Sequence, residues 1–429
     1  MSSILTNNSA MVALQTLKSI NSNLSETQSM ISTGKSVANA KDNAAVWSIS
    51  KVMESDVKGF KAISDSLALG SSTVAVAQNG AETVTDLLTE IKGKIVASQE
   101  ANVDREKIQT DITALRDQIG AVVGAAQFNG LNLLSNKETT AGSSSVNILS
   151  SLDRSSDGSV ATSNINVGKQ DLGTGKAEIA AGATATAAAS NTISGTMEAA
   201  TAIAGAATPN TQDLVIDSVP QAGTGFAVSI AADGGALEGL LDTTALDDIA
   251  YVSRDGDTTA DVAKGLAASF NSYIAENGPE GTTIAATVSG STITFTGETG
   301  AAGDTFSVQA QQYDDTSETT IGGGLAALSD IDVSTDAGAS KALESIEGLI
   351  QTAIDGAASF GSARGRIDTQ SDFISALTDS LKSGIGAMVD ADMEEASARL
   401  QALQVQQQLG VQSLSIANQA PQTILSLFR

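Results

Sequence analysis

The feature that most constrains the fold is a heptad repeat in the N-terminal third of the chain. Between residues 46 and 95 an apolar side chain recurs every seven positions, and a second apolar line follows three residues behind. This pattern predicts one long helix of roughly 75–85 Å, which needs partner helices to bury its stripe. The expected core residues are Val46, Met53, Phe60, Leu67, Val74, Ala81, Leu88 and Ile95 on the first line, and Ile49, Ile63, Ala77, Val84 and Ile91 on the second.

Both ends of the chain carry the same pattern, over residues 10–31 and 396–424, with mostly Ser, Thr, Asn and Gln at the polar positions. Residues 396–429 contain no charged side chain except Arg399 and Arg429. A solvated helix normally carries charge on its outer face, so two interpretations stay open. Other copies of the chain surround these helices, or the helices form an ordinary intramolecular coiled coil. The residues assigned to packing against other copies of the chain are Leu17, Leu24, Ile31, Leu400, Leu403, Leu414, Ala417 and Ile424.

Further helices and a different middle region follow. Asp104 is the expected N-cap of a second helix, which ends before a turn at Asn129-Gly130.

Residues 141–339 are rich in Gly, Ala, Ser and Thr, and their sequence predicts a small α+β region. Its expected strands are 214–219, 226–230, 284–295 with a turn at 289–290, and 306–308, and its expected helix buries Val262, Leu266, Phe270 and Ile274. Residues 180–207 are expected to be an irregular segment or a poorly packed helix. After residue 340 the expected helical stripes are Leu343, Ile346, Leu349, Ile350 and Ile354, then Phe373, Leu377, Leu381 and Ile385.

Composition argues against several classes of function. The chain has no Cys and no His, which removes thiol nucleophiles, disulfides, imidazole bases and the usual soft metal ligands. We therefore expect no enzyme, no metal and no cofactor. A net charge of −26 repels phosphate backbones, so nucleic acid is not an expected partner. No apolar run of about 20 residues predicts a membrane span, and the first residues do not resemble a cleavable secretory signal.

One acidic segment has a spacing that suggests a cation site. Asp390, Asp392 and Glu394 alternate along the chain as at the start of a calcium-binding loop, and Glu395 follows them. The glycine and the closing Glu of such a loop are missing. These side chains are therefore interpreted as acids at a helix N-terminus, where they complement the helix dipole.

Four short segments become distinctive when they are taken together. They read Ala40-Lys-Asp-Asn-Ala-Ala45, Ala126-Gln-Phe-Asn-Gly-Leu-Asn-Leu-Leu134, Val389-Asp-Ala-Asp-Met-Glu-Glu395 and Ala417-Asn-Gln-Ala-Pro-Gln-Thr-Ile-Leu-Ser-Leu-Phe-Arg429. In this order they resemble segments of the bacterial flagellins, over about residues 1–140 and 340–429. The start at Ser3–Asn8 and Trp47 resemble flagellins of the alphaproteobacterial kind.

The resemblance implies a fold and a domain organisation. The fold class is mainly α with an α+β insertion, in which both termini form long antiparallel helices as a coiled coil. Residues 1–42 and 390–429 would form a terminal core domain. Residues 43–140 and 340–389 would form an inner helical bundle with a hairpin, and residues 141–339 would form a β-rich variable outer region.

The resemblance also implies a function and partners. The chain would be the structural subunit that polymerises into the flagellar filament for swimming. Its partners would be further copies of itself, an export chaperone, and the cap and hook-associated proteins, with O-glycans on Ser or Thr of the middle region. It would leave the cell through flagellar type III export and reside in the extracellular flagellum. The alternative is a hook–filament junction protein, which shares the terminal helices.

A last expectation from the resemblance concerns an innate immune receptor. In many flagellins the long helix carries an Arg-Glu-Leu stretch that a Toll-like receptor contacts. Here the corresponding segment reads Leu88-Thr-Glu-Ile-Lys-Gly-Lys-Ile-Val96, so Gly93 and Lys94 stand where Arg and Glu are expected. The altered receptor surface would consist of Glu90, Lys92, Gly93 and Lys94, and we expect weak recognition because anchoring side chains are lost.

Overall fold

The computed structural model describes residues 7–155, 159–179, 203–204, 211–216, 221–234, 237, 239–243, 245–279, 282–298, 305–313 and 319–427. The chain divides into two compact units. The first comprises Met1–Asp65, Ser151–Ala161 and Ser371–Arg429, and the second comprises Ser66–Ser150 and Thr162–Gln370. Each unit is described separately below.

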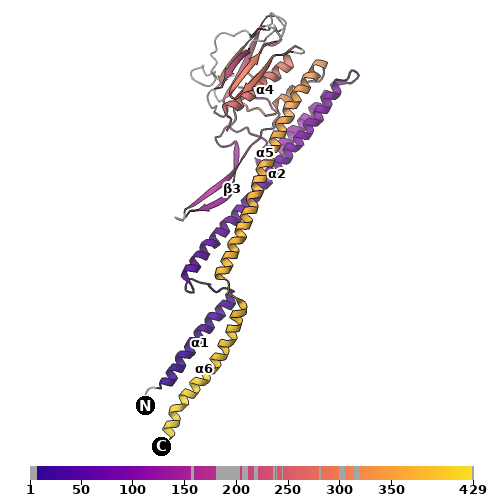
Figure 1. Ribbon diagram of the computed structural model, residues 1–429. Coiled ribbons are helices and arrows are strands. Elements are labelled where there is room, and N and C mark those ends of the chain that lie inside the picture. Colours follow the sequence, from indigo (N-terminus) through magenta and orange to yellow (C-terminus); the bar gives the residue numbers. More distant parts are fainter. Residues whose placement is uncertain are drawn as a thin grey trace. The chain divides into compact units, whose positions relative to one another are not determined.

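The first unit pairs the two ends of the chain. Helix α1 (Asn8–Thr33) lies antiparallel beside α6 (Met393–Leu427), and both chain ends lie at the same end of this pair (Figure 1). Helix α1 ends at Gly34, whose positive φ of 68° suits a residue without Cβ and whose amide donates to the Met30 carbonyl. The long helices α2 (Ala44–Ser98) and α5 (Asp336–Val389) each contribute one end to this unit.

The two connections that leave the terminal pair are joined to each other. Lys35 and Asp390 form an isolated antiparallel bridge. The Ser36 amide donates to the Val389 carbonyl at 2.7 Å, and the Ala391 amide donates to the Gly34 carbonyl at 3.0 Å. These bonds satisfy backbone groups that the helix ends leave without intrahelical partners. The breaks between α1 and α2 and between α5 and α6 therefore occur side by side.

The second unit is built on a helical bundle formed by α2, α3 (Arg105–Ala125) and α5. The Asp104 side chain accepts from the Lys107 amide and caps α3, in agreement with the sequence. Gln109 of α3 bonds the backbone of Ile331 and Val333, directly before α5. Most of the expected α2 core is buried, with no more than 9% exposure at Phe60, Ile63, Leu67, Val74, Ala77, Ala81, Val84, Leu88, Ile91 and Ile95.

The expected stripes are wrong at a few positions. Ile49 is 53% exposed, and Val46 and Met53 are only half-buried, because the first turns of α2 have fewer partners than its later turns. In α5 the expected Ile354 and Phe373 are 43% and 55% exposed. Steps of four residues overshoot a full helical turn by about 40°, so a line built from them leaves the buried face. The fully buried line of α5 instead follows sevenfold spacing through Ile346, Ala353, Phe360, Ile367 and Ile374.

Two hairpins follow α3. The first pairs β1 (Gln127–Phe128) with β2 (Leu131–Asn132) around Asn129-Gly130, as the sequence predicts, and both turn residues have positive φ. The second pairs β3 (Ser145–Arg154) with β4 (Val160–Gly168) and was not expected from the sequence. Glycines on α2 make room for side chains that precede or belong to these strands. A Cβ on Gly70 would lie 2.6 Å from Ile148, and one on Gly80 would lie 2.7 Å from Leu134.

This close approach gives a stability prediction. Gly70→Ala should lower the free energy of unfolding by about 1–2 kcal/mol, because overpacking against Ile148 exceeds the gain in helix propensity. Gly93 lies in the same helix with nothing within 4 Å of an added Cβ. Gly93→Ala, the matched control, should raise the free energy of unfolding by about 0.5–1 kcal/mol. Urea denaturation followed by helical circular dichroism measures both. Stabilisation by both substitutions would contradict the packing of Ile148 on α2.

The middle region forms two antiparallel sheets and one helix. One sheet has the order β6 (Thr211–Val215), β10 (Thr292–Thr296), β9 (Ala285–Ser289). The other has the order β5 (Ile203–Ala204), β11 (Thr305–Tyr313), β7 (Gly225–Gly234), β8 (Ala250–Val252). Helix α4 (Thr259–Asn277) starts with a capping box between Thr258 and Asp261. It buries the four expected residues, Val262, Leu266, Phe270 and Ile274, in a core shared with both sheets.

One further expectation can be compared with the structure only in part. The segment 180–207 lies outside the described residues except for the two residues of β5. The short 3₁₀ helix η2 (Ala326–Asp330) leads toward α5 and was not expected. Among the described residues, no helix is both long enough and apolar enough to cross a membrane.

Candidate interaction surface

The seam between α1 and α6 is built from the heptad residues at the two ends of the chain. Leu403 and Ala396 are 7% exposed, and Thr27 is 3% exposed. Leu17, Leu24, Ile31, Leu400, Leu414 and Ala417 are half-buried. A Cβ on Gly410 would lie 3.1 Å from a Leu17 methyl carbon, so Gly410 lets the two helices approach closely. The side chain of Ile424 lies outside the described part of the chain.

Polar side chains fix the register of this pair. Asn7 caps α1 by accepting from the Ala10 amide, and its own Nδ2 donates to the Ala417 carbonyl at 2.8 Å. Further along, Gln407 Nε2 donates to Asn21 Oδ1 at 2.7 Å. These bonds use the uncharged polar residues that the sequence places between the apolar positions. The pair is therefore specified by neutral hydrogen bonds and narrow apolar packing rather than by ion pairs.

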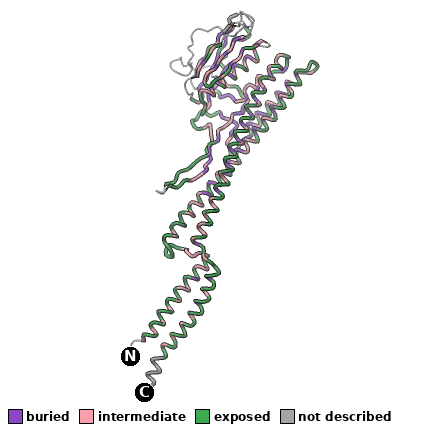
Figure 2. The backbone as a smooth tube through the Cα atoms, in the orientation of Figure 1, coloured by how far each residue is buried: buried purple, intermediate pink, exposed green. Residues whose placement is uncertain are grey.

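The pair leaves many large apolar side chains in solvent. Figure 2 shows that exposed residues predominate along α1 and α6. A two-helix pair buries one narrow stripe on each helix and leaves the other faces uncovered. We call the uncovered apolar residues the outer face of the terminal pair. They are 54–69% exposed and comprise Met11, Val12, Leu14, Val405, Leu409, Val411 and Ile416.

The heptad pattern predicts intermolecular packing at the seam and does not identify the outer face. The structure places the described seam residues between α1 and α6 of the same chain, at the half-buried and buried positions. Their role in packing between copies stays a prediction. One signal could have identified the outer face: Val405, Leu409 and Ile416 are apolar at positions off the sevenfold line, where a solvated helix would carry charge.

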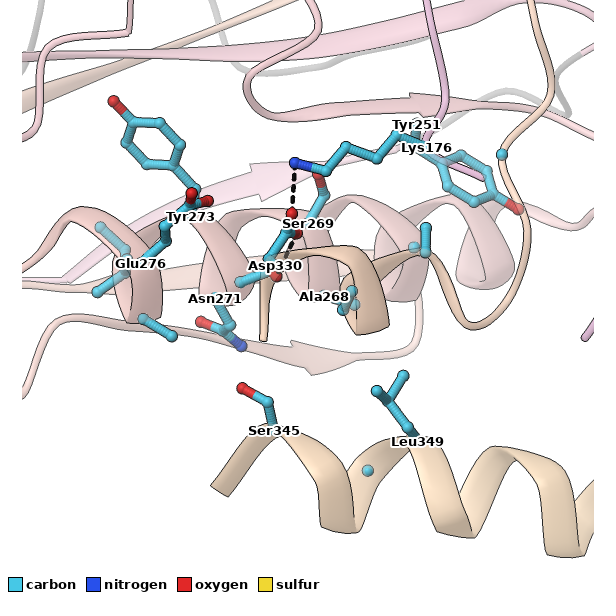
Figure 3. Close-up of a pocket in the computed structure, with 18 of the residues that line it drawn as sticks. Lys176, Tyr251, Ala268, Ser269, Asn271, Tyr273, Glu276, Asp330, Ser345 and Leu349 are labelled. Carbon is cyan, nitrogen blue, oxygen red and sulfur yellow. Dashed lines mark hydrogen bonds and ion pairs between the residues drawn. The ribbon is translucent and has the colours of Figure 1, made fainter. Parts of the chain in front are cut away.

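The second unit contains a cavity of about 1320 Å³ beside α4, η2 and the first turns of α5. In Figure 3, Asn271 and Asp330 lie on one side and Ser345 and Leu349 lie on the α5 side. Lys176 forms an ion pair with Asp330, which also accepts from the Ser272 hydroxyl at 3.1 Å. Burial, and then the negative charge of Asp330, raise the pKa of Glu276.

Several polar groups around this cavity bond one another. The hydroxyl of the half-buried Tyr251 donates to Asp257 at 2.7 Å, and burial raises the pKa of Tyr251. Arg254 donates to the Gly322 carbonyl and lies 3.7 Å from the buried carboxylate of Asp171. The described residues contain no group of three His, Cys, Asp or Glu side chains that could hold a metal ion. The arrangement joins the α+β region to the segments beside the bundle.

The residues expected at an altered receptor surface lie at the exposed side of α2. Glu90 and Gly93 are exposed, and Lys92 and Lys94 are half-buried. Lys94 Nζ lies 2.5 Å from Asp111 Oδ2 of α3, and Lys92 forms an ion pair with Glu347 of α5. The hydrogen bond to Asp111, and then the negative charge of Asp111, raise the pKa of Lys94. Both cations are thus held against neighbouring helices of the bundle.

Comparison with known proteins connects both ends of the chain to one family. The family model of the bacterial flagellin N-terminal helical region matches residues 4–139, and that of the C-terminal helical region matches residues 343–428. Flagellin A of Rhizobium meliloti is 35% identical over 438 residues, covering 100% of both chains. Flagellin B of Rhizobium meliloti is 35% identical over 434 residues, and a flagellin of Brucella melitensis biotype 1 is 30% identical over 430 residues, each with 100% coverage of both chains.

Proposed function

Because the chain belongs to the bacterial flagellin family and is a structural subunit of the flagellar filament, we propose that the outer face of its terminal pair makes the contacts between subunits. The observation that carries this proposal is the exposure of seven large apolar side chains on two helices that together have only five charged side chains. Fully burying one such side chain contributes about 1.5–3 kcal/mol to the free energy of association. Burying several of them between subunits therefore outweighs the entropic cost of ordering the helices.

Seeded polymerisation tests this function. Purified monomer added to short filament fragments should extend them, as judged by sedimentation and electron microscopy. A hook–filament junction protein, the alternative, would cap the fragments without extending them. The full-length similarity to proteins named flagellin favours the filament subunit.

The domain organisation belongs to the same proposal. Residues 1–42 and 390–429 form the terminal core domain, 43–140 and 340–389 the inner bundle, and 141–339 the outer region. The helix breaks at Gly34 and Asp390 support the first boundary. The separate apolar core of the middle region, which extends from Leu214 to Ala310, supports the second. Limited proteolysis should cut between these segments before it cuts within them.

Flagellins are structural proteins, and membership of this family implies that the chain is located in the extracellular flagellar filament. We propose further that this chain performs no catalysis, which the lack of Cys and His supports.

The proposed secretion route of the chain is flagellar type III export. Its proposed partners are an export chaperone and the cap and hook-associated proteins, and its middle region is proposed to carry O-glycans. Loss of secretion in a strain without the export apparatus would support the route. Intact-mass measurement of filament protein would detect the glycans.

We also propose that the surface around Glu90, Lys92, Gly93 and Lys94 weakens recognition by the Toll-like receptor. The ion pair between Lys94 and Asp111 supports this, because it holds a cation where a carboxylate is expected. Replacing Gly93 by Arg and Lys94 by Glu should increase receptor activation, since each restored contact contributes about 1–2 kcal/mol or more.

A receptor-reporter cell assay with purified monomer measures this effect. The open space around Gly93 accommodates a side chain, so the double variant should fold. Gly93→Ala, which adds no anchoring group, is the matched control and should leave activation unchanged. Strong activation by the unmodified chain at low concentration would contradict the proposal.

A further inference from the structure

The chain contains three Asn-Gly steps in very different surroundings: Asn79-Gly80, Asn129-Gly130 and Asn277-Gly278. Asn-Gly is the dipeptide most open to attack by the following backbone nitrogen on the side-chain amide, because glycine has no Cβ to obstruct the approach. In a folded chain this reaction also needs backbone freedom. The local structure at each step therefore decides which asparagine reacts.

Two of the steps are held by helices. Asn79-Gly80 lies in the interior of α2, where the Gly80 amide belongs to the helical hydrogen-bond ladder and the residue is buried against Leu134. At the end of α4, the Gly278 amide donates to the Ile274 carbonyl at 2.8 Å. There the Asn277 side-chain amide donates to the Tyr273 carbonyl at 3.1 Å, which restrains the group that would be attacked.

The third step is free of these restraints. Asn129 and Gly130 form the exposed turn between β1 and β2, at φ values of 51° and 80°. Within the described structure, neither the Asn129 side chain nor the Gly130 amide has a hydrogen-bond partner. The hairpin has only two residue pairs, Gln127 with Asn132 and Phe128 with Leu131, so opening the turn requires little local unfolding.

We propose that Asn129 is the site at which the folded chain deamidates spontaneously, whereas Asn79 and Asn277 are protected. The Gly130 nitrogen forms a bond to Asn129 Cγ, the Cγ–Nδ2 bond breaks, and ammonia leaves with the proton lost from Gly130. Water then opens the resulting five-membered imide at either carbonyl. One opening gives aspartate and the other isoaspartate, so the net reaction consumes one water and releases one ammonia without any redox change.

The two products differ in their effect on the hairpin. Aspartate followed by glycine suits the same two-residue turn, so that product keeps the turn and adds one negative charge. Isoaspartate adds a methylene group to the backbone, and the two-residue turn no longer closes. Its effect extends to Asn132, which bonds the Val123 carbonyl and the Leu134 amide at 2.7 and 2.8 Å. The fraction of subunits with aspartate or isoaspartate at position 129 would therefore increase with the age of the filament.

Ageing the purified full chain in mildly alkaline buffer, followed by peptide mass spectrometry with isoaspartate detection, tests the proposal. In the folded chain Asn129 should convert at least about tenfold faster than either other site, equivalent to about 1.4 kcal/mol in the barrier. In denaturant the three rates should converge. Equal conversion of Asn79 or Asn277 in the folded chain would overturn the proposal, as would the same tenfold ranking in denaturant.

Two variants sharpen the test. Asn129→Gln should remove most of the isoaspartate formed in the folded chain, since the longer side chain forms its ring less readily. Asn79→Gln, the matched control, should leave that signal unchanged. Circular dichroism confirms that both variants are folded. A folded Asn129→Gln variant that accumulates isoaspartate at the unmodified rate would place the reactive site elsewhere.

Discussion

Removing residues 401–429 should abolish polymerisation and leave a soluble protein with a folded bundle and middle region. The deletion removes Leu403, Gly410 and Leu414, which line the seam with α1, together with most of the outer face. An unpaired α1 is expected to fray, because an isolated helix of this length is only marginally stable in water. The second unit contains none of the deleted residues, so its core should survive.

The measurement combines seeded polymerisation with circular dichroism. The truncated chain should show no elongation of seeds at concentrations where the full chain elongates them completely. Its helical signal should fall only by the contribution of the terminal pair. Elongation of seeds by the truncated chain would contradict the role of the terminal helices.

Replacing Ile416 by Asp should prevent assembly without changing the monomer. Ile416 is 69% exposed in the single chain, so the substitution is nearly neutral there. In the filament it would bury an unpaired charge, which costs several kcal/mol, and lose apolar contact. The critical concentration for elongation should rise at least about a hundredfold, since each tenfold change corresponds to about 1.4 kcal/mol.

Two further variants separate the outer face from the seam. Ile416→Val keeps an apolar side chain and, as the matched control, should elongate seeds almost normally. Leu403→Asp changes a residue that is 7% exposed, so it should disrupt the α1–α6 pair in the monomer as well as assembly. Normal elongation by Ile416→Asp would show that the outer face is not covered in the filament.

The helices could be predicted from the sequence because heptad spacing is a local pattern, and the residues that form it lie on one face of the folded helix. The α2 residues from Phe60 to Ile95 are buried where the repeat places them. The four α4 residues lie at four-residue spacing and are buried as expected, because α4 is short and its core is shared with both sheets. The turn at Asn129-Gly130 was also predictable, since that dipeptide favours positive φ at both positions.

Other features depend on contacts that no local pattern encodes. The β3–β4 hairpin was missed, although Gly70 and Gly80 on α2 leave the space that Ile148 and Leu134 fill. Phe373 and Ile354 were placed on buried stripes because apolar residues at four-residue spacing resemble a helical face over short distances. The outer face could not be identified from the sevenfold line, because its apolar residues lie off that line.

We expect neighbouring subunits to cover the outer face of the terminal pair. Electron cryomicroscopy of filaments grown from this chain on seeds tests it most directly. The outer-face residues, all more than half exposed in the single chain, should lie buried between subunits: Met11, Val12, Leu14, Val405, Leu409, Val411 and Ile416. A filament in which these side chains remain in solvent, with the subunit contacts made only by other parts of the chain, would contradict it.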